Sequence, residues 1–102
     1  MTWWFDGQKG STPNFSAAKM TINAKSNSEE HFHSNCYELF VVKAGEVSLI
    51  VDGTTHKLHR GDSFLIAPIS KHLVFNETDQ IAEITIVYSA AERNYTVVLK
   101  QL

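Results

Sequence analysis

The chain has 102 residues, of which 43% are hydrophobic and 11% aromatic, and its formal net charge at pH 7 is -2. This length fits a single domain, residues 1–102, and the hydrophobic content excludes a disordered chain. The small negative charge excludes the basic surface of a protein that binds nucleic acid by itself or an anionic membrane.

The N-terminal region carries no targeting or membrane-spanning signal. Residues 1–6, Met-Thr-Trp-Trp-Phe-Asp, contain neither a basic segment nor a long apolar segment. No apolar run approaches the roughly 20 residues that a spanning helix needs. The single cysteine, Cys36, cannot form an internal disulfide, which is typical of the reducing cytosol. We therefore expect a cytoplasmic protein with no membrane partner.

The first predicted element is the aromatic segment at residues 3–5. It predicts either a first strand packed on the core or a surface that covers a second subunit, because exposed aromatic side chains usually have a partner. The second alternative would give a homodimer. Residues 6–14 predict a loop from their Gly, Ser, Pro and Asn content, residues 15–24 an extended segment, and residues 25–30 a polar loop.

Residues 37–43 carry a clear strand pattern. They are rich in β-branched and aromatic types and are followed by Ala-Gly. Because side chains alternate along a strand, Glu38, Phe40 and Val42 share one face, which we expect to point inward.

The next two predicted strands, residues 47–51 and 54–58, are separated by Asp52-Gly53. This dipeptide is the strongest short-range signal for a β-hairpin. Further strands are predicted over residues 63–66, 72–76, 81–88 and 95–99. Many short strands with turns between them, and no sustained helical period, indicate an all-β antiparallel sandwich or barrel.

The residues with the clearest chemistry are His31 and His33, which lie one pleat apart on the same face of an extended strand. Two adjacent imidazoles make a poor core and a good pair of metal ligands. Glu38 can return to the same place across a turn at Ser34-Asn35. A third imidazole, such as that of His72, would complete a set that suits one divalent transition metal: Fe, Mn, Ni, Co or Zn.

Residues 31–38, His-Phe-His-Ser-Asn-Cys-Tyr-Glu, and then Gly45 resemble the first motif of the cupin superfamily. Residues 61–76 resemble the second motif, and the resemblance spans about residues 30–88. It implies an antiparallel double-stranded β-helix, or jelly-roll barrel. The metal ligands that it implies are His31, His33, Glu38 and His72, and it places Asn76 at the closing position of the second motif without making it a ligand.

Two positions depart from the family's pattern. The glycine six residues before His31 is Lys25 here, and the Pro-x-Gly of the second motif is replaced by Ala67-Pro68-Ile69. Neither change affects a ligand position, but we expect the second turn to be built differently.

Residues 37–42 and 61–66 also resemble the N-terminal sensor domain of AraC-type transcription regulators. Those proteins carry a helix-turn-helix DNA-binding region after the cupin. This chain has no helical pattern and no basic patch before Leu102, so we expect no DNA binding of that kind by the chain alone.

Inward-facing side chains are predicted to wall a small-molecule pocket beside the metal. The candidates are Phe40, Val42, Leu49, Val74 and Asn76. No general base stands out among them, so any catalysis would depend on the metal and its bound water. Two hypotheses follow: a metal-dependent enzyme acting on a small organic molecule, with catalytic residues unknown, and a non-catalytic sensor of a sugar-like molecule.

The remaining polar candidates are given structural roles. His56 and His59 are three positions apart on one strand and face opposite ways, so they cannot both join the site. Cys36 is expected to fill a small buried space, and Tyr37 points away from Glu38. Because imidazole binds a metal only when neutral, metal affinity is expected to fall as the pH drops through about 6.5.

Overall fold

The structure, a computed structural model, describes residues 1–5 and 15–99, and the regular elements in this part of the chain are strands. The loop predicted over residues 6–14 lies outside the described residues. No helix in the described part is long and apolar enough to cross a membrane.

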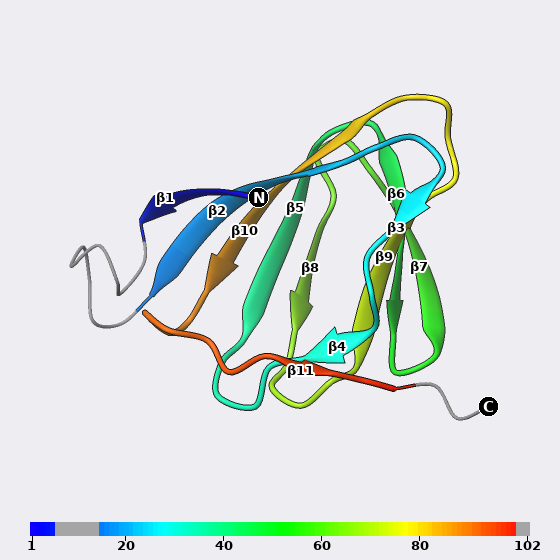
Figure 1. Cartoon of the computed structure of the whole chain (residues 1–102). Coiled ribbons are helices and arrows are strands. Elements are labelled where there is room, and N and C mark those ends of the chain that lie inside the picture. Colours follow the sequence, from blue (N-terminus) through cyan, green and yellow to red (C-terminus); the bar gives the residue numbers. More distant parts are fainter. Residues whose placement is uncertain (6–14, 100–102) are drawn as a thin grey trace.

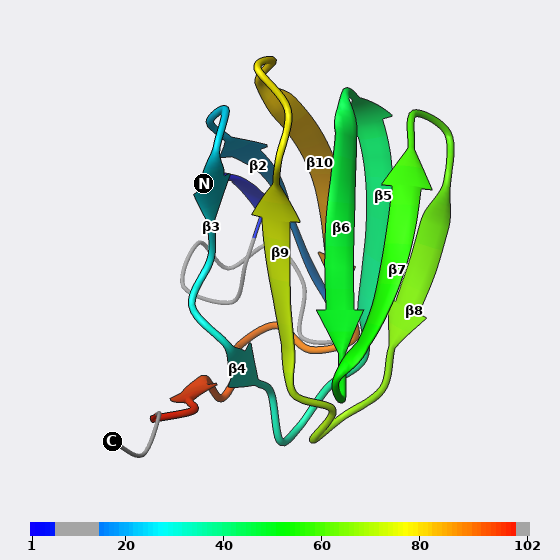
Figure 2. The same ribbon diagram turned by 90° about the vertical axis from the view of Figure 1, so that its right-hand side faces the viewer.

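The strands form two antiparallel sheets. The first has the order β1 (Thr2–Phe5), β2 (Ser16–Ile22), β10 (Ala82–Tyr88), β5 (Glu38–Ala44) and β8 (Ser63–Ile66). The second has the order β11 (Thr96–Val97), β4 (His31–Phe32), β9 (His72–Asn76), β6 (Glu46–Val51) and β7 (Thr54–His59), and β3 (Ser26–Asn27) pairs with β9. The two sheets face each other (Figures 1 and 2). The all-β antiparallel prediction is confirmed, and the described pairings leave the sheets separate rather than closed into one barrel.

Alternation of side chains along β5 builds one wall of the core. Glu38, Phe40 and Val42 are buried, as predicted, while Leu39 between them is exposed. The neighbouring strand β10 has the same alternation: each of its buried residues is paired with a residue of β2, and Ile84, Ile86 and Tyr88 are also paired with the buried residues of β5. The core between the sheets includes the fully buried side chains of Phe40, Leu49, Ile84 and Ile86.

The predicted hairpin is formed by β6 and β7, whose last pair is Val51 with Thr54. Its two central residues, Asp52 and Gly53, have φ angles of 47° and 84°. Two positive φ angles in a two-residue loop define the turn whose twist matches that of the flanking strands. The Asp-Gly dipeptide therefore acts as the sequence indicated.

The N-terminal aromatic segment forms β1, which pairs with β2 at the edge of the first sheet. Trp3 is packed against the core, whereas Trp4 is exposed. Of the two alternatives for this segment, the packed first strand is the one observed, and the homodimer stays a prediction.

Both positions where the chain departs from the cupin glycines have left-handed backbone conformations. The φ angle is 59° at Lys25 and 73° at Ile69. Ile69 thus adopts a conformation that glycine adopts at no steric cost, and the expectation that the second turn is built differently stays a prediction. Hydrogen bonds fix this conformation: Ile69 N donates to His33 O at 2.8 Å, and Lys25 N donates to Thr78 O at 3.2 Å.

Replacing Ile69 with glycine is expected to stabilise the fold. A left-handed conformation costs a residue with a Cβ about 1–2 kcal/mol, and the Ile69 side chain is 65% exposed, so little burial is lost. Glycine offsets about 0.5–1 kcal/mol of this gain, because it raises the conformational entropy of the unfolded chain. The net gain, about 0.5–1 kcal/mol, should raise the melting temperature by a few degrees in a thermal unfolding scan.

The control for this experiment is Ile81→Gly. Ile81 is 59% exposed and is not among the residues with positive φ. Its replacement carries the entropic cost without the relief of strain, so its melting temperature should fall or stay the same. Equal shifts in the two variants would show that the Ile69 conformation stores no strain.

Candidate metal centre

The four predicted ligands come from both sheets and meet at one point, and we call them the ligand cluster: His31, His33, Glu38 and His72. His31 and His72 are directly paired across β4 and β9. His33 follows β4, and Glu38 begins β5 in the facing sheet. One ligand atom from each residue lies within 4.8 Å of all the others. The pairing of β4 with β9 thus brings His31 and His72, which are far apart in the sequence, next to each other.

The centre of the ligand cluster is the carboxylate of Glu38. Its Oε1 atom lies 3.2 Å from His33 Nε2 and 3.2 Å from His72 Nε2. The three residues are almost completely buried, and none of these three atoms has a hydrogen-bond partner. Buried polar atoms without partners are rare and call for an explanation.

The other ring nitrogen of each histidine is anchored by a backbone carbonyl. His31 Nδ1 contacts Glu29 O, His33 Nδ1 contacts Asn94 O, and His72 Nδ1 contacts Ser70 O, each at 2.9 Å. A carbonyl oxygen can only accept, so each Nδ1 carries a proton and donates it. In the neutral rings, Nε2 is left with a lone pair directed at the centre of the cluster. Such anchoring fixes the tautomer and the ring orientation of metal-binding histidines.

This arrangement fits a metal ion. Without a cation, the lone pairs of His33 Nε2 and His72 Nε2 would oppose the negative oxygen of Glu38 at 3.2 Å. A divalent cation between the three atoms removes both repulsions, whereas one proton removes only the repulsion of the nitrogen that it binds. Donor atoms about 2.1 Å from one ion, at right angles around it, stand about 3.0 Å apart, close to the observed separations. Imidazole and carboxylate donors together suit the divalent transition metals.

The charges within the ligand cluster shift three pKa values. Burial alone would raise the pKa of Glu38, but the interactions with His33 and His72 outweigh burial and lower it to about 2. Burial would lower the pKa of His72, yet the Glu38 carboxylate, the Ser70 carbonyl and Asp52 raise it above its ordinary value. Burial and the neighbouring imidazoles lower the pKa of His31 despite its bond to Glu29. Glu38 is therefore ionised at neutral pH, and His72 holds a proton more strongly than His31 does.

Metal affinity is expected to fall as the pH decreases through the raised pKa of His72. Below that pKa the ring is protonated in the metal-free protein, and the ion must displace the proton. One displaced proton lowers the affinity about tenfold per pH unit, and the decline should begin above 6.5. Competition with a chromophoric chelator from pH 5 to 8.5, corrected for the chelator's own protonation, measures this slope. An affinity unchanged between pH 5 and 8 would argue against histidine ligands.

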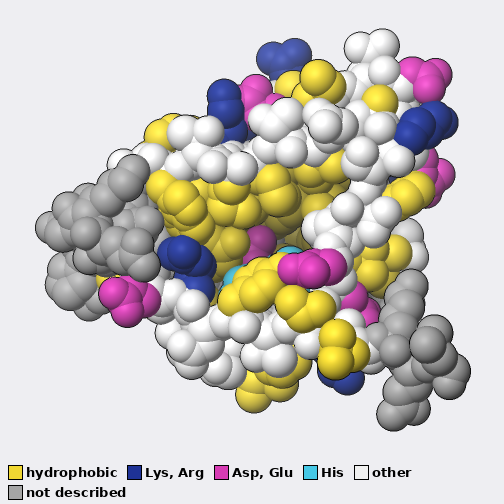
Figure 3. Space-filling model, in the orientation of Figure 1, with side chains coloured by type: hydrophobic (Ala, Val, Ile, Leu, Met, Phe, Trp, Pro, Cys, Tyr) yellow, Lys and Arg dark blue, Asp and Glu magenta, His cyan; other side chains and the backbone are white. Residues whose placement is uncertain are grey.

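A cavity of about 380 Å³ opens above the ligand cluster, and His31, Glu38 and His72 form part of its lining. Figure 3 shows a hollow walled by hydrophobic side chains, with acidic and histidine side chains at its base. Of the predicted pocket residues, the structure places Phe40, Leu49 and Val74 on this cavity.

The other two predicted pocket residues, Val42 and Asn76, are buried but are not part of the lining. The Asn76 amide donates to Ile22 O at 3.1 Å and to Gln80 O at 2.7 Å, and its carbonyl oxygen accepts from Thr78 N at 3.0 Å. Its amide therefore holds the β9–β10 turn rather than facing the cavity.

Sequence reasoning missed four polar residues of the cavity, Ser28, Glu29, Tyr88 and Tyr95. Tyr88 was predictable, because it continues the buried alternation of β10 and is paired with Glu38. Tyr95 stacks on the His31 ring with centroids 4.6 Å apart, and its hydroxyl donates to Glu29 Oε1 at 2.6 Å. No local pattern indicated this contact, since it joins residues 66 positions apart.

The remaining candidates lie outside the ligand cluster. His59 is exposed and contacts Glu46 and Asp62, and the ring of His56 packs against Phe64 with centroids 4.5 Å apart. Neither histidine belongs to the cluster. Cys36 is buried, as predicted for a space-filling residue, and Tyr37 is exposed.

Comparison with known proteins identifies the fold. Residues 18–88 match a family model described as a cupin domain. A structure from work on the mechanism of oxalate oxidase superposes with a TM-score of 0.84 and 18% identity over 92% of this chain and 52% of that chain. The polyketide cyclase RemF from Streptomyces resistomycificus gives a TM-score of 0.82 and 18% identity over 97% and 70% of the two chains. These similarities confirm the predicted double-stranded β-helix.

A third similar structure is a Cupin 2 conserved barrel domain protein from Salinispora arenicola. It gives a TM-score of 0.69 and 28% identity over 76% of this chain and 65% of that chain. No curated protein sequence matches the chain significantly. The chain spans about half the length of the oxalate oxidase chains that it resembles.

Proposed function

The chain belongs to the cupin family, and we propose that it is a metal-dependent enzyme that acts on a small organic molecule in the cavity above the ligand cluster. One observation carries this proposal. Three imidazoles are fixed through Nδ1 to backbone carbonyls, so that their Nε2 atoms and Glu38 Oε1 converge at the base of an open cavity. Four donors oriented at the base of a cavity are suited to binding an ion that a small molecule can reach.

The residues of the ligand cluster would hold one divalent ion of Fe, Mn, Ni, Co or Zn. Such an ion supplies Lewis-acid chemistry toward an oxygen atom of the bound molecule, or activates oxygen if it is redox-active. Glu38, ionised at neutral pH because of its low pKa, contributes the negative charge that favours the ion.

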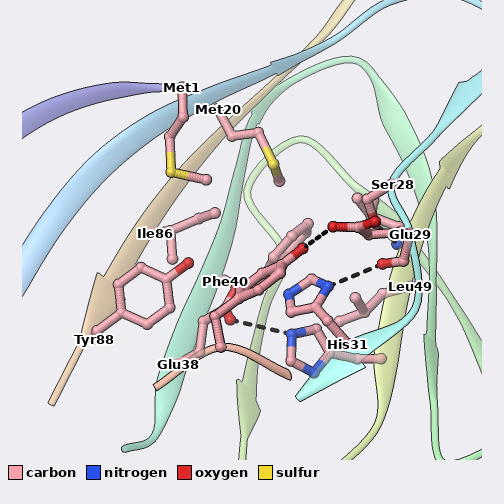
Figure 4. A pocket seen from close by; sticks show the side chains of 13 residues that line it. Met1, Met20, Ser28, Glu29, His31, Glu38, Phe40, Leu49, Ile86 and Tyr88 are labelled. Atoms are coloured by element: carbon pink, nitrogen blue, oxygen red, sulfur yellow. Dashed lines mark hydrogen bonds and ion pairs between the residues drawn. The ribbon is translucent and has the colours of Figure 1, made fainter. Parts of the chain in front are cut away.

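The tyrosines of the cavity would serve as hydrogen-bond donors. Burial and the negative charge of Glu38 raise the pKa of the Tyr88 hydroxyl well above its ordinary value, so it keeps its proton at neutral pH. Figure 4 shows this hydroxyl directed into the cavity. It can donate a hydrogen bond to an oxygen of the bound molecule and orient it toward the ligand cluster. The hydroxyl of Tyr95 already donates to Glu29 and thereby holds one side of the cavity.

The test of this function is the metal content of protein purified without added metal or chelator, measured by plasma mass spectrometry. About one transition-metal ion per chain supports the metal-dependent function, and the identity of the ion narrows the reaction class. No bound metal, even after anaerobic loading with Fe, Mn or Ni, would contradict it.

The Glu38 carboxylate also supports a second candidate function, that of a metal-free sensor or binding module. A proton on His72 Nε2 would pair that atom with Glu38 Oε1 without an ion, since the two atoms lie 3.2 Å apart. Protein that binds small molecules in the cavity but no metal would establish this alternative.

A further inference from the structure

The wall of the cavity is apolar and adaptable in shape. Phe40, Leu49 and Ile86 line it with rigid hydrocarbon surface, while Met1 and Met20 contribute flexible thioethers. Figure 4 shows the two methionine side chains across the cavity from His31. Methionine fills irregular gaps and adapts to a bound apolar group. A molecule that fills this space therefore gains most from apolar surface.

The charged side chains that line the cavity are acidic in the part of the chain that the structure describes, namely Glu29 and Glu38. Arg93 is not among the lining residues. Its guanidinium carbon lies 3.7 Å from the ring centre of Trp3 and 5.0 Å from that of Tyr88, so its charge is engaged with the faces of these rings. The described wall thus offers no lysine or arginine side chain to an anionic molecule.

The charge of the centre limits the charge of its ligand. Three neutral imidazoles, the Glu38 carboxylate and a divalent ion carry a net charge of +1. A molecule with one negative charge neutralises this centre. A dianion leaves an excess negative charge in an apolar cavity that also faces Glu29, and burying an unpaired charge is costly.

We infer that the cavity takes a largely apolar molecule that carries at most one negative charge and presents oxygen atoms to the ligand cluster. This inference rests on the proposed metal-dependent function and specifies its substrate class. It places small dianions such as oxalate outside the preferred class. The Tyr88 hydroxyl supplies one hydrogen-bond donor for an oxygen of such a molecule.

Three chelating probes test the inference on Ni²⁺-loaded protein by isothermal titration calorimetry. Benzohydroxamate and acetohydroxamate share the same two oxygen donors and differ in a phenyl and a methyl group, whereas oxalate is a dianion without apolar surface. Each association constant is divided by that of the same probe for free Ni²⁺ in the same buffer. We expect the normalised affinity for benzohydroxamate to exceed that for acetohydroxamate at least tenfold, with oxalate the weakest.

Two variants with the same added charge test the role of the wall. Met20→Lys places an ammonium group at the cavity, whereas Thr21→Lys places it on the exposed face of the same strand. Met20→Lys is expected to raise the normalised affinity for oxalate relative to benzohydroxamate at least tenfold, and Thr21→Lys is expected to leave the ratio unchanged. Metal content, measured for both, shows whether either variant retains its ion.

The outcomes separate this inference from the proposed function. Equal normalised affinities for the two hydroxamates, or an oxalate affinity that matches theirs, would overturn the substrate class alone. The substrate class would also be overturned if Met20→Lys and Thr21→Lys gave the same ratio of oxalate affinity to benzohydroxamate affinity. Protein that binds neither Ni²⁺ nor another transition metal would overturn the proposed function and the substrate class together.

Discussion

Protein with the substitution His33→Ala is expected to lose its metal, with a decrease in affinity of more than about 100-fold. Loss of an outer partner of a ligand already costs about 10–100-fold, and His33 is itself a candidate ligand, 4% exposed and fixed to Asn94 O. Its removal also leaves Glu38 with one imidazole neighbour in a buried site. Metal content per chain and competition with a chelator both measure the loss.

The matched control is His59→Ala, which removes an exposed imidazole outside the ligand cluster. Its metal content should equal that of the unmodified protein. Thermal unfolding of both variants without metal separates loss of the site from loss of the fold. Metal retained at full stoichiometry by folded His33→Ala protein would rule out the proposed centre.

The substitution Gly45→Ala is expected to lower the free energy of unfolding by about 2–3 kcal/mol. Gly45 has a φ angle of 81°, which costs a residue with a Cβ about 1–2 kcal/mol. An added Cβ would also lie 3.1 Å from Ala82 Cα and 3.2 Å from Ile81 O. Both neighbours are backbone atoms, so the start of β10 must shift to make room for the added Cβ. Overpacking of this kind costs about 1–3 kcal/mol.

Thermal unfolding measures this effect, and the expected decrease in melting temperature is about 10–20 °C for a domain of this size. Gly53→Ala isolates the contribution of the contact, because Gly53 has a similar φ angle of 84° and no atom within 4 Å of the added Cβ. Its expected loss is only about 0.5–1 kcal/mol, because the lower entropy of the unfolded chain offsets part of the strain of about 1–2 kcal/mol. Equal losses of unfolding free energy in the two variants would show that the contact of the added Cβ with β10 does not destabilise the fold.

The sequence by itself determined the features that depend on local periodicity. Alternation along residues 37–43 was enough to predict that Glu38 and Phe40 point inward. The Asp52-Gly53 dipeptide specified its hairpin, because few residues other than glycine tolerate the positive φ angles of that turn. The four members of the ligand cluster were also named from the sequence, three by spacing and strand parity and His72 by the cupin resemblance.

Only the tertiary structure decided what surrounds those residues. The carbonyl that orients His33 belongs to Asn94, 61 positions away, and such a contact leaves no trace in a local pattern. No local pattern indicated that Tyr95 stacks on His31 or that the Asn76 amide donates to the turn that follows β9.

At Ile69 the tertiary structure overrides a local preference. Its local preference disfavours a left-handed turn, yet the hydrogen bond to His33 O and the pairing of the flanking strands outweigh a cost of about 1–2 kcal/mol. Local rules and the family resemblance therefore named the members of the ligand cluster, whereas contacts between distant residues set the direction of their lone pairs and the shape of the cavity above them.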